Sequence, residues 1–94
     1  MEMEEVKKLV KVELVKLNAF WETSESQHGS MGHFRFFNDD LEVSLQEFYS
    51  EWSQEVNVFL GFELNGLDYD ITSFNANQKS IEKLFAEYKR IKEE

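Results

Sequence analysis

The feature that most constrains the fold is a run of alternating apolar and polar residues around an Asn-Gly pair. Apolar side chains recur at every second position over residues 56–64 and again over residues 67–71, on either side of Asn65 and Gly66. An Asn-Gly pair favours a two-residue type I′ turn, because both central residues of that turn need a positive φ. Alternation with a period of two places the apolar side chains on one face of a strand. We therefore expect residues 56–73 to form a β-hairpin with one buried face.

Three further segments have weaker patterns. Residues 9–22 alternate in hydrophobicity with one change of phase, which favours a strand with a bulge; apolar residues also recur there at helical spacing, and this alternative stays open. Residues 23–32 are polar and contain glycine, so they are expected to form a long loop. Residues 33–37 are expected to form a short strand with Phe34 and Phe36 on one face.

Two helices are expected. Ser44 and Glu47 form the Ser-x-x-Glu pattern of a capping box, which predicts a helix over residues 44–54. Apolar residues at helical spacing follow Asn75 and Asn77, and either asparagine can cap a helix that continues to the C-terminus. The expected order is strand, strand, helix, strand, strand, helix. Such a chain predicts an α+β fold, in which a small antiparallel sheet of about four strands carries both helices on one face.

Composition bounds the class of protein. A chain of 94 residues, 41% of them apolar, is expected to form a single domain over residues 1–94. Cysteine is absent, which excludes disulfides and thiolate metal sites and favours a reducing compartment, the cytoplasm. The acidic N-terminus does not resemble a signal peptide, and no apolar run approaches the ~20 residues of a membrane-spanning helix. The formal net charge of −9 argues against direct binding to nucleic acid or to a membrane.

The negative charge is concentrated in one central stretch. Residues 36–78 contain nine acidic residues and no lysine or arginine. The flanking segments are close to neutral, with six acids and five bases in residues 1–35 and four acids and five bases in residues 79–94. Acidic and basic residues are therefore mixed elsewhere in the chain but not in its centre.

The expected elements bring like charges together twice in this stretch. On a helix over residues 44–54, three glutamates would stand at i, i+4 and i+8, where like charges are destabilising. A two-residue hairpin turn would place Glu63 opposite Asp68, which is also unfavourable. Repeated electrostatic cost indicates a surface retained for binding, although an acidic surface can also serve solubility alone. The predicted partner-binding residues are Asp39, Asp40, Glu47, Glu51, Glu55, Glu63, Asp68, Asp70, Phe37 and Phe59.

The two phenylalanines in this set follow from strand parity. Parity places Phe37 and Phe59 with Arg35 and Glu63 on the sheet face opposite the helices. Aromatic side chains beside carboxylates suit an interface with a basic protein. A shift of one residue in register would instead bury both rings.

No pattern in the sequence supports catalysis. There is no glycine-rich phosphate loop, no serine in a nucleophile elbow and no cysteine. His28 and His33 are separated by a spacing that matches no metal-ligand pattern. We therefore expect a protein that is not an enzyme, with no catalytic residues, no metal and no cofactor.

The function that these features favour is binding of a basic protein partner, such as a nuclease or another nucleic-acid-binding protein. An acidic face would steer the partner electrostatically and compete with nucleic acid for its basic surface. No motif ties the chain to a family. As a class, it resembles the small acidic inhibitors that phages direct against host nucleases, including anti-restriction and anti-CRISPR proteins, and the immunity proteins that block nuclease toxins. A homodimeric assembly module and a small-ligand or metal-binding domain remain the alternatives.

Overall fold

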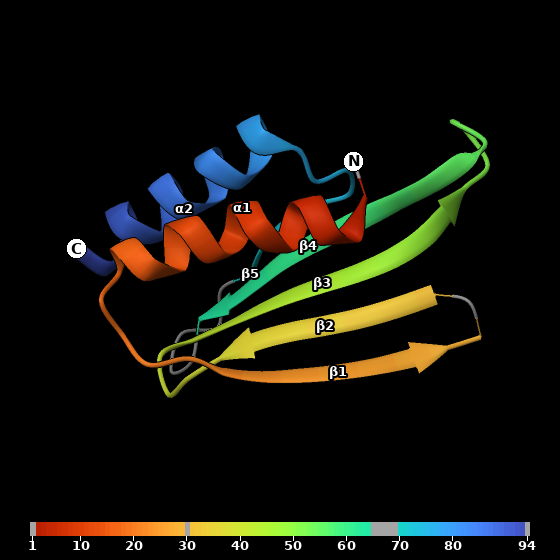
Figure 1. Ribbon diagram of the computed structural model, residues 1–94. Helices are drawn as coiled ribbons and strands as arrows, with labels where there is room; N and C mark the ends of the chain where they lie inside the picture. The colour runs from red at the N-terminus through yellow and green to blue at the C-terminus, as the bar shows by residue number, and fades with distance from the viewer. Residues whose placement is uncertain (1, 30, 65–69, 94) are drawn as a thin grey trace.

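The computed structural model describes residues 2–29, 31–64 and 70–93. Two helices flank five strands in the order αβββββα, and both helices lie on the same face of the sheet (Figure 1). The strands pair antiparallel in their sequence order, β1-β2-β3-β4-β5. The α+β class, the antiparallel sheet and the two helices on one face are thus confirmed. The elements are α1 (Met3–Lys16), β1 (Glu22–His28), β2 (Met31–Phe37), β3 (Leu41–Ser50), β4 (Glu55–Leu64), β5 (Asp70–Ser73) and α2 (Gln78–Glu93).

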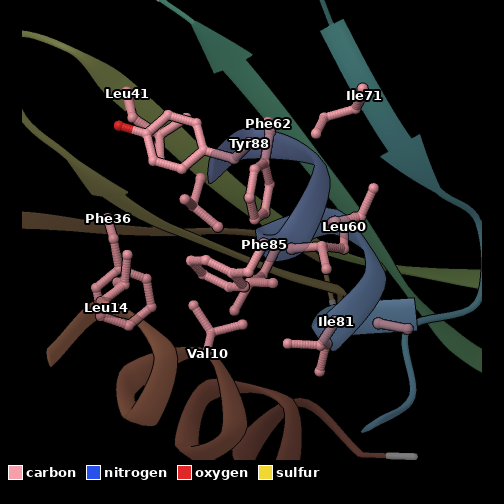
Figure 2. Packing of buried hydrophobic residues seen from close by; sticks show 14 of the residues in the cluster. Val10, Leu14, Phe36, Leu41, Leu60, Phe62, Ile71, Ile81, Phe85 and Tyr88 are labelled. Carbon is pink, nitrogen blue, oxygen red and sulfur yellow. The ribbon is translucent and has the colours of Figure 1, made fainter. Parts of the chain in front are cut away.

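The hydrophobic core fills the space between the two helices and the sheet (Figure 2). Val10 and Leu14 of α1 and Phe85 of α2 point towards the apolar face of β2–β5. The ring of Phe62 on β4 meets the ring of Phe85 edge to face, with 4.8 Å between their centroids. Burial of each large apolar side chain contributes about 1.5–3 kcal/mol, so this layer supplies most of the favourable free energy of folding.

The first helix corrects the strand predicted over residues 9–22. Val6, Val10 and Leu14 stand at i, i+4 and i+8 and are buried against the sheet. Val12 and Val15, which produced the apparent alternation, are exposed. Burial of one helical face therefore outweighs the β-propensity of valine, and the helical alternative is correct for residues 9–16, whereas residues 17–21 connect α1 to β1.

The third strand corrects the helix predicted over residues 44–54. Leu41, Val43 and Leu45 alternate along β3 and are all fully buried. Residue by residue, β3 pairs with β2 on one side and with β4 on the other. Two ladders of backbone hydrogen bonds and a buried face outweigh a capping box, which satisfies only two backbone N–H groups.

The first strand corrects the long loop predicted over residues 23–32. β1 pairs along its whole length with β2, and Gly29 adopts a φ of +62° in the connection. Glycine accepts this conformation without a steric penalty. The residues of β1 are all polar, since this is an edge strand whose side chains need not be buried. No hydrophobic alternation was therefore available to predict it.

The elements predicted for the C-terminal half are largely confirmed. β4 and β5 pair antiparallel, but Glu63 lies opposite Asp70 rather than Asp68. Asn65, Gly66 and Asp68 lie outside the described residues. Asn77 caps α2 reciprocally: its Oδ1 accepts the Ser80 N–H, and the Ser80 Oγ accepts the Asn77 N–H, both at 2.9 Å.

Candidate partner-binding surface

The sheet face opposite the helices, which we call the open face, has a line of acidic positions across it. The strand register places one residue of each strand in a single cross-strand row. Adjacent strands are about 4.8 Å apart, so a row across five strands extends about 19 Å. In order from β1 to β5, this row consists of Glu22, Phe37, Glu42, Glu63 and Asp70. We call its four acids the acidic row.

One arginine partly neutralises the acidic row. The Arg35 guanidinium donates a hydrogen bond to Glu42 Oε1 at 2.6 Å and lies 5.3 Å from the centroid of the Phe37 ring. On the open-face positions of the described strands, Arg35 is the one lysine or arginine. Glu63 is exposed and takes part in none of the ion pairs between described residues. The row therefore keeps a net negative charge.

An aromatic patch lies on the same open face, four residues along β4 from the acidic row, which is roughly 14 Å at about 3.4 Å per residue. Phe48, Phe59 and Phe74, together with Gln46, line a shallow hollow of about 300 Å³. The rings of Phe59 and Phe74 meet edge to face at 5.4 Å, and Phe74 is 72% exposed. A Cβ atom at Gly61 would lie 3.0 Å from the Phe59 ring. Glycine at this position therefore lets the Phe59 ring lie flat along the open face.

The structure places the predicted aromatic anchors together with part of the predicted acidic surface. Phe37 and Phe59 both lie on the open face with Glu63, as strand parity predicted. Both rings are half-buried: Phe37 lies under the Arg35 guanidinium, and Phe59 lies against the Phe74 ring. Asp70 occupies the last position of the acidic row.

The predicted stripe of Glu47, Glu51 and Glu55 is not formed. Glu47 lies on the helix side of β3, where its Oε1 accepts the backbone N–H of Gly32 at 2.9 Å. Glu51 lies in the turn after β3, and Glu55 begins β4. Glu55 lies opposite Ser50, eight residues along β3 from Glu42, so at about 3.4 Å per residue this end of the hairpin is roughly 27 Å from the acidic row.

The two aspartates predicted at the edge of the surface lie in the β2–β3 turn. The Asn38 side chain orders this turn by accepting the backbone N–H groups of Asp40 and Leu41. The Asp40 carboxylate lies 3.5 Å from the Lys92 ammonium. Asp39 lies beside it in the same turn, and Asp68 is outside the described residues.

The prediction from sequence missed Glu22, Glu42, Phe48 and Phe74 as members of this surface. Glu42 alternates with the buried Leu41 and Val43, a period of two that was available in the sequence. No comparable signal marked Glu22, because β1 has no apolar residue.

The described residues contain no group of three or more His, Asp or Glu side chains placed to hold a metal ion. A wider groove of about 900 Å³ lies on the helix side, between the start of α1 and the end of the β3–β4 hairpin. Lys7 in this groove pairs with Glu4 at 3.1 Å and with Glu25 at 3.7 Å. These are ordinary ion pairs of partly exposed groups rather than a nucleophile with its base.

No protein-family model, curated protein or solved structure matches this chain. Neither α1 nor α2 is long and apolar enough to cross a lipid bilayer. The fold and the surface define the protein as a small α+β domain with an acidic and aromatic open sheet face.

Proposed function

We propose that this protein is a non-enzymatic binding protein that places its open face against a basic surface of a protein partner. The observation that carries the proposal is that the acidic row and the aromatic patch share the sheet face that no helix covers. Interfaces between proteins commonly combine aromatic anchors with a polar rim. The aromatic patch supplies the anchors, and the acidic row supplies the charged rim.

The charge of the row favours a partner with a basic groove. The row of about 19 Å has an acidic position on four of its five strands, and it presents negative charge as a nucleic-acid backbone does. A groove that ordinarily holds nucleic acid would therefore accept this row in its place. The proposed role is that of an inhibitor acting in the cytoplasm, in the manner of phage anti-defence proteins or toxin-immunity proteins.

The acidic row also opposes folding, which supports a role beyond stability. Glu63 faces an acidic position on each neighbouring strand, Glu42 on β3 and Asp70 on β5. Like charges directly opposite on neighbouring strands are destabilising. A lysine at the central position would be more stable, so the carboxylate is better explained by binding.

The test is capture of partners on the immobilised protein, with variants that separate charge from aromatic contact. We would compare the wild type with E63K in the acidic row and F59S in the aromatic patch. E82K is the matched control, because Glu82 is exposed on α2 and the substitution changes the net charge by the same amount. Bound proteins would be eluted by added salt and, separately, by double-stranded DNA as a competitor.

The proposal predicts that wild type and E82K retain the same basic proteins and that E63K and F59S lose them. It also predicts release by salt and by DNA, because both compete for the partner's basic groove. Equal retention by E63K and E82K would refute the proposed surface. Retention that DNA does not reduce would refute the choice of a nucleic-acid groove as target.

A further inference from the structure

The end of the β3–β4 hairpin carries exposed apolar side chains that the open face does not use. Residues 49–56, which we call the arm, extend past the N-terminal end of α1 (Figure 1). Trp52 in its turn is 100% exposed, and Tyr49 and Val56 behind it are also exposed. Tyr49 and Val56 lie opposite each other on the helix side of the sheet. A tryptophan that can bury 150–250 Å² is usually sheltered, so this arm favours contact with another surface.

The charge of the arm restricts what that surface can be. Glu51 and Glu55 are exposed beside Trp52, and neither belongs to an ion pair within the described part of the chain. Exposed aromatic side chains also occur where proteins meet membranes, but two carboxylates without a lysine or arginine would be repelled by anionic lipid. The arm therefore fits an apolar surface with positive charge.

The outward side of α1 is such a surface. Lys8, Lys11, Val12 and Val15, which we call the α1 stripe, are all exposed, and Val15 is 77% exposed. Lys7 and Lys16 pair with glutamates of the same helix. The two stripe lysines have no such partner among the residues that the structure describes. The arm and the stripe thus match in both apolar character and charge.

We propose that the protein forms a two-fold dimer in which the arm of each copy packs on the α1 stripe of the other. The turn of the arm lies beyond the N-terminal end of α1, so the arm does not lie along the α1 stripe of its own chain and the contact requires a second copy. Tyr49 and Val56 of the arm lie on the helix side, as the α1 stripe does, and Glu51 and Glu55 lie at the tip and edge of the hairpin. This arrangement allows two copies to exchange arms reciprocally and close the assembly. The acidic row and the aromatic patch take no part in this contact. The dimer is therefore independent of the proposed function and would leave two open faces available.

The decisive experiment is a charge exchange followed by light scattering and sedimentation equilibrium at micromolar concentrations. The measurements would use about 0.1 M salt, where the Debye length is about 10 Å. Salt at this concentration screens the long-range repulsion between two acidic chains more than it weakens charge pairs in direct contact. The wild type should have twice the chain mass of 11.2 kDa. The arm variant E51K/E55K and the stripe variant K8E/K11E should each weaken the dimer at least about tenfold, because like charges then meet across the contact.

An equimolar mixture of the arm variant and the stripe variant should restore the dimer. In that mixture, the lysines of the altered arm meet the glutamates of the altered stripe, while the second contact is that of the wild type. E63K is the control, since it changes charge on the open face and should remain dimeric. Circular dichroism of each variant separates a lost contact from a lost fold.

The emission of Trp52 supplies a second measurement in a W21F background, where Trp52 is the remaining tryptophan. Its emission maximum should shift to shorter wavelength in the dimer. In the arm variant, the maximum should lie at the longer wavelength of an exposed tryptophan. A wild type that stays monomeric throughout the concentration range would overturn the proposal. So would a mixture of the two variants that stays monomeric, or a dimer that F59S abolishes while E51K/E55K does not. Monomeric protein whose Trp52 emission responds to a lysine-rich peptide would assign the arm to a different partner.

Discussion

Replacing Glu63 by lysine should make the protein more stable. Glu63 lies directly opposite Glu42 on one neighbouring strand and opposite Asp70 on the other. E63K converts both cross-strand pairs from like to opposite charge, and such pairs are worth about 0.2–1 kcal/mol each. The hydrogen bond from Arg35 to Glu42 already offsets part of the repulsion. We therefore expect a gain in the free energy of unfolding near the lower end of the combined range, about 0.5–1 kcal/mol.

Urea and thermal unfolding followed by circular dichroism would measure this gain. In a domain of this size, about 0.5–1 kcal/mol corresponds to a rise of roughly 2–8 °C in Tm. The gain should shrink in about 1 M salt, where the Debye length is only about 3 Å. The control E82K should stay within about 0.5 kcal/mol of the wild type. A destabilised E63K, or a gain that salt does not reduce, would refute the electrostatic account of the acidic row.

Four further variants test the fold by urea unfolding, the last of them as a function of pH. Ser44→Ala should change the free energy of unfolding by less than about 0.5 kcal/mol, because Ser44 lies in a strand and caps no helix. Asn77→Ala should lower it by about 1 kcal/mol, because Asn77 caps α2. Equal losses would contradict the assignment of Ser44 to strand β3. Leu14→Ala should cost about 2–5 kcal/mol, and a smaller loss would argue against a buried α1. A hydrogen bond to Tyr88 raises the pKa of Lys92. Folding therefore favours the protonated amine of Lys92. The wild type should be more stable than Lys92→Met at neutral pH, and this difference in the free energy of unfolding should fade above pH 10.5. A difference that grows above pH 10.5 would contradict the raised pKa of Lys92.

The sequence predicted those elements in which the apolar residues themselves follow one period. β2, β4 and α2 each have a simple apolar repeat, and Asn77 marks the start of α2. α1 failed this criterion, because the exposed Val12 and Val15 imitate the alternation of a strand. Which valines are buried depends on the packing of α1 against the sheet, and a local pattern does not contain that information.

The candidate surface could be predicted only in part for a related reason. Parity placed Phe37 and Phe59 correctly, because the face of a residue within one strand depends on local alternation alone. The acidic row depends on the register between five strands, and all four of its acids belong to strands that were missed or paired differently. The stripe predicted from Glu47 depended on a helix that the chain does not form.

The central claim is that the acidic row favours binding at the expense of folding stability. The most direct test is the amount of basic protein retained by immobilised E63K relative to wild type and E82K, measured at about 0.1 M and about 1 M salt. At low salt, E63K should retain much less basic protein than the wild type and E82K, although it is more stable. At high salt, the three proteins should retain equal amounts. Retention by E63K equal to that of the wild type at low salt would contradict the central claim.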